Sequence, residues 1–157
     1  MDLRSRGLRV VGYFYNPNIQ PEEEYLKRLK VAIDSAHQLK YELVIGEYGF
    51  KNWSGQVKGL EDEPEGGKRC EVCFDLRLKD SFNKARELKL DYFTSTLSVS
   101  PHKNAALINK IGKSISPEIY LESDFKKNDG FRKTMDFARK VNFYRQNYCG
   151  CLFGRRN

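Results

Sequence analysis

Short apolar runs and amphipathic stretches alternate along the first half of the chain. Residues 8–15 (LRVVGYFY) are a compact β-branched and aromatic run that predicts a buried strand, and residues 41–48 (YELVIGEY) predict a second one. Between them, apolar side chains recur at helical spacing over residues 21–40, behind a proline and three glutamates that are typical of a helix start. Residues 49–69 predict a glycine-rich loop that carries Trp53.

The second half continues the alternation. A helical pattern runs from about residue 70 to 89, and residues 91–97 (DYFTSTL) predict the next strand. A polar turn, a helix over 103–114, a short strand over 118–122 (EIYLE) and a last helix over 131–141 follow. This order is typical of an α/β fold, so we expect residues 1–157 to form a single Rossmann-like or nucleotide-hydrolase-like domain, a parallel sheet with helices on both faces.

The start of the chain has an incomplete pattern. Residues 2–7 (DLRSRG) have the basic side chains and the terminal glycine that are typical of the last turn of a helix. Two interpretations stay open. Either a preceding strand and most of its helix are absent, or these residues are a frayed tail.

The composition excludes two classes of protein. With 39% hydrophobic and 31% charged residues, the chain is too apolar for a disordered segment and too polar for an integral membrane protein. Its longest apolar run, residues 10–15, is far shorter than the ~18 residues of a spanning helix, and the N-terminus lacks the apolar core of a signal peptide. We therefore expect a soluble, cytoplasmic protein without a membrane partner.

The net charge of +7 is concentrated at one end. Residues 125–157 contain nine basic and two acidic side chains, which account for the whole excess, together with seven of the aromatic residues. A basic segment with interleaved aromatics suits RNA, whose phosphates attract the cations and whose bases stack on the rings. The alternative is an amphipathic terminal helix with a solvated basic face.

Two of the four cysteines lie at the predicted start of a helix. The spacing of Cys70 and Cys73 places both sulfur atoms on one side of the first turn, where the helix dipole and the neighbouring Lys68 and Arg69 favour thiolates. In a reducing compartment such a pair is more often a metal or redox site than a structural disulfide. The alternative is a pair of buried thiols that pack as small apolar groups.

The other two cysteines, Cys149 and Cys151, are separated by one glycine. A disulfide across so short a loop would be strained and easily reduced, which suits a redox relay, although both thiols could also ligate a metal or be buried as free thiols. All four cysteines together could hold one metal only if the tertiary fold assembled the two pairs.

A third group of polar residues, 94–103, lies at the end of a predicted strand and leads into a helix, the place where α/β sheets bind ligands and anions. His102 is either a proton donor or a helix-capping residue. The asparagines after the first strand end at the same edge, although turn formation explains them equally well. The substrate-binding residues expected at this edge are Asn16, Asn18, Ser98, Ser100, His102 and Lys103.

Five stretches of this sequence together resemble one family, the QueH-type epoxyqueuosine reductases. They are residues 13–19 (YFYNPNI), 65–78 (EGGKRCEVCFDLRL), 93–104 (FTSTLSVSPHKN), 124–134 (DFKKNDGFRKT) and 144–151 (YRQNYCGC). The resemblance extends from about residue 8 to 152. It implies a cobalamin-independent oxidoreductase that reduces the epoxide of epoxyqueuosine to queuosine at the wobble position of a tRNA anticodon.

The resemblance also implies the cofactor and its ligands. The family uses an iron–sulfur centre, here expected as a 4Fe-4S cluster, and allows an additional iron. Cys70 and Cys73 match cluster ligands, and Cys149 and Cys151 match either a redox-active disulfide, which we favour, or further metal ligands. Family members begin with a strand that ends in an adjacent Cys-Cys pair, and nothing before Leu8 matches it. We therefore expect an N-terminally shortened chain.

Conversion of an epoxide to an alkene and water consumes two electrons and two protons. An iron centre can bind the epoxide oxygen as a Lewis acid while the cluster or a dithiol delivers electrons from an unidentified donor. Candidates for the acid are Asp75, His102 and Tyr144. The basic segment, including Arg145, would hold the anticodon arm.

Two other functions compete with this hypothesis. One is a non-enzymatic RNA-binding domain with a structural zinc on the four cysteines. The other is a tRNA thiolation enzyme on a similar fold, which would need a glycine-rich phosphate loop after its first strand. The sequence has no such loop.

Overall fold

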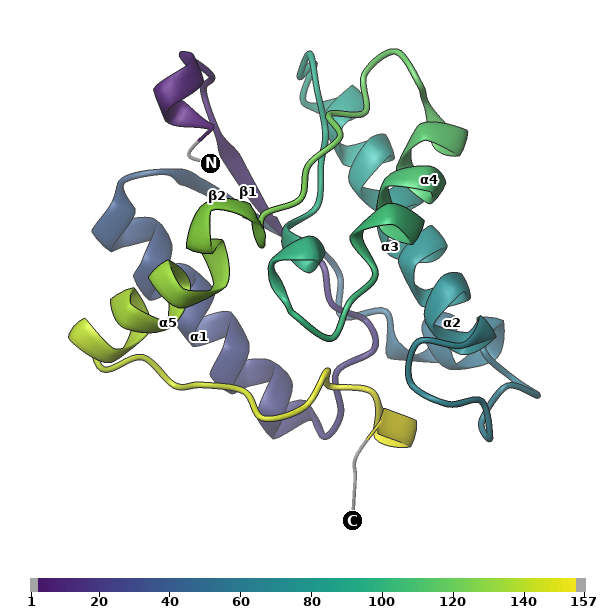
Figure 1. Cartoon of the computed structure of the whole chain (residues 1–157). Helices are drawn as coiled ribbons and strands as arrows, with labels where there is room; N and C mark the ends of the chain where they lie inside the picture. The colour runs from purple at the N-terminus through teal and green to yellow at the C-terminus, as the bar shows by residue number, and fades with distance from the viewer. Residues whose placement is uncertain (1–2, 155–157) are drawn as a thin grey trace.

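The computed structural model describes residues 3–154; Met1, Asp2 and residues 155–157 lie outside the described part (Figure 1). The two strands and five α-helices of that part are β1 (Val11–Phe14), α1 (Glu22–Leu39), β2 (Glu42–Ile45), α2 (Phe50–Gln56), α3 (Lys68–Glu87), α4 (Ala105–Ile115) and α5 (Gly130–Lys140). Short 3-10 turns, η1 to η4, lie at Arg4–Arg6, Thr96–Val99, Lys127–Asp129 and Leu152–Gly154. None of the described helices combines the length and apolarity needed to cross a bilayer.

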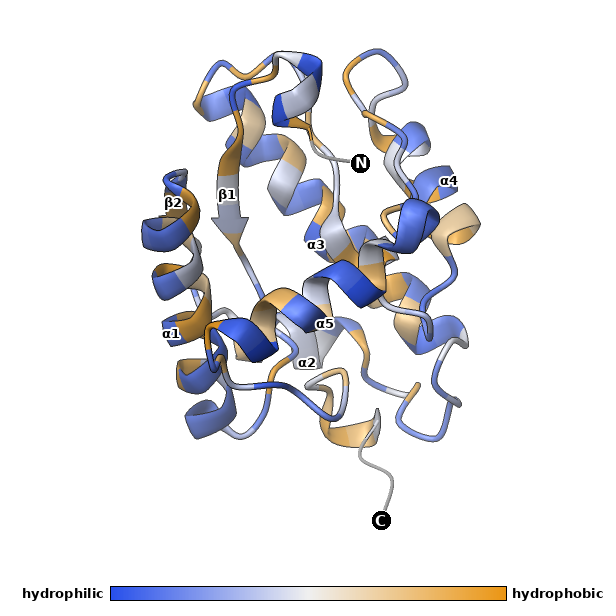
Figure 2. Ribbon diagram, turned by 60° about the vertical axis from the view of Figure 1, so that its left-hand side comes forward, coloured by the Kyte–Doolittle hydropathy of each residue, from blue (hydrophilic) through white to orange (hydrophobic). Residues whose placement is uncertain are grey.

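The two strands pair in parallel and α1 is the crossover between them. Residue Val11 is opposite Glu42 and Phe14 is opposite Ile45. Phe14 packs with Ile19 and Tyr25 in an apolar cluster beneath α1. Tyr13 points the other way, as alternation along a strand requires, and its hydroxyl donates to Asp80 of α3 at 2.5 Å. Both views accordingly place β1 between α1 and α3 (Figure 1, Figure 2), and the expected α/β class with a parallel sheet is confirmed.

The rest of the expected sheet is smaller than the sequence predicts. Phe93 and Tyr120 form a single parallel bridge, so the predicted strands over 91–97 and 118–122 are wrong in extent. The bridge consists of two backbone hydrogen bonds, from Phe93 N–H to Ile119 and from Leu121 N–H to Phe93. Beyond it, Ser95 caps a 3-10 turn by accepting from Leu97 N–H, which ends the extended backbone.

This second parallel pair packs on a core of its own. The core consists of one face of α3, the buried side of α4 and the two bridge residues: Phe74, Leu78, Ala85, Ile108, Phe93 and Tyr120. Within the described residues no backbone pairing joins it to β1 and β2. The structure therefore has two parallel pairs: α3 packs against the Phe93–Tyr120 pair and is hydrogen-bonded to β1 through Asp80 and Tyr13.

Three further details test the sequence predictions. The predicted loop over 49–69 contains α2, which buries Trp53 almost completely. The helix predicted over 103–114 begins later than expected, at Ala105, because the Asn104 side chain accepts from Leu107 N–H as its N-cap. The N-terminal turn is confirmed for residues 4–6, with Gly7 as its left-handed cap at φ 76°; Asp2, part of the same prediction, lies outside the described residues.

Close packing at Gly112 gives the first testable prediction. A Cβ atom on Gly112 would lie 2.2 Å from the Tyr120 ring, so Gly112→Ala should lower the free energy of unfolding by about 1–3 kcal/mol. Gly55 of α2 is the matched control because a Cβ there meets nothing within 4 Å. Gly55→Ala should leave stability unchanged or raise it by up to about 1 kcal/mol. Urea denaturation measures both, and equal effects of the two variants would contradict the prediction.

Candidate functional site: a pocket lined by four cysteines

The fold brings all four cysteines to one small pocket of about 20 Å³. Cys70 and Cys73 come from the first turn of α3, and Cys149 and Cys151 from the segment after α5. The remaining lining residues are Asn18, Trp53, Arg69, Phe74, Arg77 and Lys103. The pairing of two distant cysteine motifs, which the sequence left open, is thus a property of the tertiary structure.

Cys70 and Cys73 differ in their surroundings. Cys70 is half-buried, and the N–H of Gly66 donates to its sulfur at 3.2 Å. Cys73 is buried, and this burial raises the pKa of its thiol. The helix start alone therefore does not make Cys73 a thiolate, contrary to the expectation for the pair.

Cys149 and Cys151 form no disulfide, and their side chains are hydrogen-bonded to each other. The Cys151 thiol donates to the Cys149 sulfur, which lowers the pKa of Cys149 to about 6, and the Lys103 ammonium lowers it further. The same hydrogen bond raises the pKa of Cys151. Near neutral pH, Cys149 is therefore the thiolate of the pair and Cys151 keeps its proton.

Unpaired polar atoms surround this pocket. In the described part of the chain, four buried side-chain nitrogen or oxygen atoms have no hydrogen-bond partner. Three of them, Trp53 Nε1, Arg69 Nε and Asn18 Oδ1, belong to pocket residues that are 3% exposed or less. Each such atom costs about 1–3 kcal/mol, and native proteins rarely leave them unsatisfied. Two of the three are N–H donors, and the Trp53 donor faces the Cys73 sulfur, whose pKa it lowers.

The thiols do not form a ready coordination sphere. Among residues 3–154, no three His, Cys, Asp or Glu side chains are arranged to hold one metal ion. Cys70 and Cys73 nevertheless supply two soft thiolate ligands, the type that iron–sulfur clusters use. The donor chemistry and the unpaired N–H groups therefore fit such a group at two ligand positions.

Two predicted substrate-binding residues lie in the pocket and a third is adjacent to it. Asn18 donates to the carbonyl of Cys149 at 3.3 Å. Lys103 lies over the Phe74 ring, with Nζ 5.5 Å from the ring centre. Asn16 accepts from the pocket residue Arg77. Asn18 and Lys103 therefore line one pocket, and binding of the substrate there stays a prediction.

The other loop residues are not brought to the pocket lining. Ser98 is fully buried, and its hydroxyl accepts from Phe125 N–H at 3.2 Å. Ser100 accepts from the backbone of His102, whose side chain is exposed. These contacts hold the 94–103 loop together and attach it to the backbone at Phe125.

The remaining predicted residues lie outside the pocket lining as well. Asp75 forms an ion pair with Lys79 along α3 at 2.7 Å. The Tyr144 hydroxyl donates to Glu24 of α1 at 2.7 Å. Arg145 is exposed.

The whole chain, including this pocket, is similar to known proteins. A family model described as "Epoxyqueuosine reductase QueH" matches residues 1–157. The chain belongs to the epoxyqueuosine reductase QueH family. Proteins named Epoxyqueuosine reductase QueH from Streptococcus pyogenes serotype M1, Staphylococcus epidermidis and Thermotoga maritima are 41%, 42% and 36% identical to it over 94%, 90% and 90% of its length. The matches cover 61%, 64% and 77% of those proteins, so the chain spans less than two thirds of the first two.

Three pocket residues of this QueH-family chain were not expected from chemistry. Trp53 was expected in a loop, and the only signal for its burial was that it is the single tryptophan of the chain. Arg69 was expected to act as a charge beside the thiols, but it is buried and donates to the carbonyls of Leu60 and Glu61 at 3.1 and 2.8 Å. Arg77 had no signal beyond the motif that contains it.

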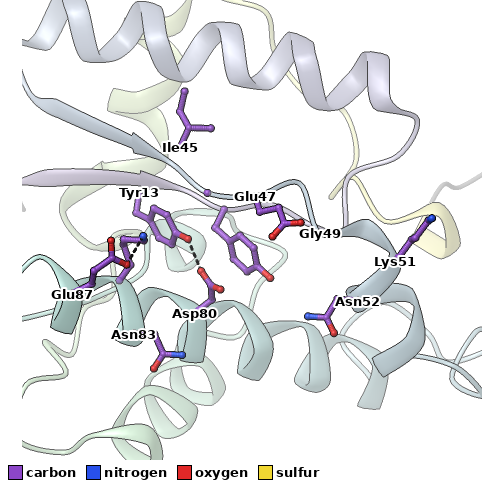
Figure 3. A pocket seen from close by; sticks show the side chains of 12 residues that line it. Tyr13, Ile45, Glu47, Gly49, Lys51, Asn52, Asp80, Asn83 and Glu87 are labelled. Atoms are coloured by element: carbon purple, nitrogen blue, oxygen red, sulfur yellow. Dashed lines mark hydrogen bonds and ion pairs between the residues drawn. The ribbon is translucent and has the colours of Figure 1, made fainter.

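A second, larger hollow of about 560 Å³ lies between the β1–β2 pair and α3 and shares no lining residue with the cysteine pocket (Figure 3). Tyr13 and Tyr15 line it with parallel rings whose centres are 6.0 Å apart. Burial and the nearby Asp80 carboxylate raise the pKa of Tyr15 to about 12, so its hydroxyl stays protonated. Figure 3 shows the Tyr13 hydroxyl directed at Asp80 on α3.

The ionisation of Cys149 gives a prediction for the metal-free protein. Only the thiolate is alkylated, so the iodoacetamide rate at Cys149, followed by peptide mass spectrometry, should rise with pH through about 6. Cys151→Ala removes the donor and should move this midpoint up toward the ordinary thiol pKa of about 8.5. Cys70→Ala is the control and should leave the midpoint in place. A wild-type midpoint already at the ordinary value would contradict the assignment.

Proposed function

We propose that this chain catalyses the reduction of epoxyqueuosine to queuosine in a tRNA anticodon, with the cysteine pocket as its centre. The observation that carries the proposal is the meeting of both cysteine pairs in one pocket of a QueH-family chain. The unpaired buried donors at the same place support a bound anionic group.

In this proposal Cys70 and Cys73 hold an iron–sulfur cluster, which we expect to be 4Fe-4S. The resemblance to the family also allows an additional iron. When bound, this group supplies electrons and a Lewis acid. Arg69 Nε would donate to its sulfur atoms, which resolves that unpaired N–H group, and Trp53 N–H would donate to the Cys73 thiolate, whose pKa it lowers. The Cys73 thiol must lose its proton on binding because only thiolates ligate.

The Cys149–Cys151 pair matches the reaction in electrons. Oxidation of the thiolate–thiol pair to a disulfide releases two electrons and one proton. One further proton, from solvent or from the Lys103 ammonium, completes the conversion of the epoxide to an alkene and water. An external reductant then restores the two thiols. Cys151 lies in the pocket and loses its proton when the disulfide forms, whereas Asp75, His102 and Tyr144 lie outside the pocket lining.

The RNA would contact the basic C-terminal segment. None of the α5 side chains is buried, and this helix exposes Arg132, Lys133, Arg139 and Lys140. The exposed aromatic residues Phe131 and Tyr144 lie on the same segment and could stack on bases. Arg155 and Arg156, which add to the predicted charge, lie outside the described residues.

Reconstitution with iron and sulfide under anaerobic conditions tests the enzymatic proposal. We expect broad visible absorbance, quenching of the fluorescence of the lone Trp53, and, with dithionite and tRNA that carries epoxyqueuosine, loss of one oxygen atom from the modified nucleoside. Cys70→Ala and Cys73→Ala should abolish the absorbance.

The cysteine-pair variants separate the two roles left open for that pair. Cys149→Ala and Cys151→Ala should keep the absorbance and lose the reduction if the pair is redox-active, and should lose both if the pair ligates metal. A colourless protein with one equivalent of zinc and no reduction would refute the enzyme and favour the RNA-binding rival.

Binding of RNA is tested separately by the salt dependence of tRNA affinity. Among the described residues Lys133 and Lys140 have no ion-pair partner, whereas Arg132 and Arg139 pair with Asp129 and Asp136. The double variant Lys133→Ala/Lys140→Ala should weaken binding and reduce the slope of log K against log salt by about one per lost phosphate contact. Lys30→Ala/Lys79→Ala, two cations elsewhere, is the control. Equal slopes for the two double variants would exclude α5 from the interface.

A further inference from the structure

We propose that Glu24 and Arg28 of α1 form a buried clamp that holds the strap, defined as residues 144–151, over the cysteine pocket. They would be positioning residues for Cys149 and Cys151, acting through the backbone rather than by touching substrate. Their value to catalysis rests on the proposed function, whereas the clamp itself can be tested on the thiols alone.

The Arg28 guanidinium uses all three of its nitrogens in this clamp. Nε donates to Glu24 at 2.7 Å, Nη1 to the carbonyl of Cys149 at 3.1 Å, and Nη2 to the carbonyl of Tyr148 at 3.0 Å. Its carbon lies 5.1 Å from the centre of the Tyr148 ring. The side chains of Arg28 and Glu24 are only 9% and 8% exposed. A buried cation therefore binds two successive carbonyls of the strap, ending at the thiolate residue.

Glu24 secures the start of the same strap. Its second carboxylate oxygen accepts from the Tyr144 hydroxyl at 2.7 Å. Burial alone would raise the pKa of Glu24, but the hydrogen bonds from Tyr144 and Arg28 outweigh it, so the pKa is lowered and the carboxylate stays charged. The clamp is thus a compensated ion pair, and removal of Arg28 leaves an uncompensated buried charge.

Apart from the clamp, a few hydrogen bonds to the residues before α1 hold the strap in place. Residues 143–151 belong to no helix or strand, so no hydrogen-bond ladder fixes their course. Beyond the clamp, Gln20 N–H donates to the Gly150 carbonyl at 2.8 Å, Asn18 donates to the Cys149 carbonyl at 3.3 Å, and the Tyr148 hydroxyl donates to the carbonyl of Gln20. Gly150 has φ 101°, and a Cβ there would lie 2.7 Å from Ile19 and 3.0 Å from Arg28. Position 150 therefore needs glycine for the strap to lie against the clamp.

The test uses the reduced, metal-free chain and measures native iodoacetamide alkylation of each cysteine at one mildly alkaline pH. Cys151 is 7% exposed and Cys73 is 9% exposed, but only Cys151 lies on the strap. Arg28→Gln should accelerate alkylation of Cys151 by about tenfold or more, because a charged hydrogen-bond network is lost. Cys73 packs against the strap in the same apolar cluster but is held by α3, so its acceleration should be clearly smaller. Arg28→Lys keeps the charge beside Glu24 but not the fork, and should give partial protection.

Controls separate a local clamp from general stability. Lys30→Gln, which removes the exposed Lys30–Asp34 ion pair from the same helix, should change neither rate. Tyr144→Phe removes one bond without leaving an unpaired buried cation; it should accelerate Cys151 several-fold and serves if Arg28→Gln does not fold. Acceleration of Cys73 and Cys151 by equal factors, or of neither, would overturn the clamp. Either result is independent of whether the chain reduces epoxyqueuosine.

Discussion

The position of α3 between two parallel pairs is the constraint on which the rest of the structure depends. Its apolar face packs on α4 and the Phe93–Tyr120 bridge, and Asp80 on the other side accepts from Tyr13 of β1. Arg77 of the same helix donates to Asn16 after β1. Cys70 and Cys73 lie in the first turn of this helix. Its contacts therefore determine where the two cysteines lie relative to both parallel strand pairs.

Burial raises the thiol pKa in both cysteine pairs, but only in one of them does a hydrogen bond outweigh it. Desolvation raises the pKa of Cys73 and keeps it neutral, whereas a hydrogen bond from Cys151 outweighs desolvation at Cys149 and keeps that sulfur ionised. One pocket therefore contains a protonated thiol, Cys73, and a thiolate, Cys149. A shared dielectric environment alone could not give this asymmetry; the thiol–thiol hydrogen bond provides it.

The sequence predicts local features well and distant contacts poorly. Helical periodicity found α1 and α3, and motif spacing found both cysteine pairs. The sequence pattern predicted too long a strand over 91–97, because it does not reveal that the Ser95 side chain caps a 3-10 turn. It missed α2, whose seven residues give too few turns for a periodic signal.

The clamp shows that the role of a single residue often cannot be predicted from the sequence around it. On an amphipathic helix, Glu24 and Arg28 have the i,i+4 spacing of an ordinary solvated pair. Only the docking of a segment more than 100 positions away, shown by the Arg28 bond to Cys149 at a separation of 121 residues, buries them and gives them a function. No local pattern could report that contact.

The same C-terminal segment combines two roles that would otherwise need separate elements. Its α5 turns cations toward solvent, while its strap returns to α1 and carries Cys149 and Cys151 inward. The buried Glu24–Arg28 pair has no net charge, so it anchors the strap without altering the basic character of the outer face. An RNA attracted to α5 would therefore meet a surface whose continuation leads, within ten residues of Lys140, to the cysteine pocket. In the proposed function, the cations that attract the RNA and the cysteine pair that supplies electrons are therefore parts of one continuous segment.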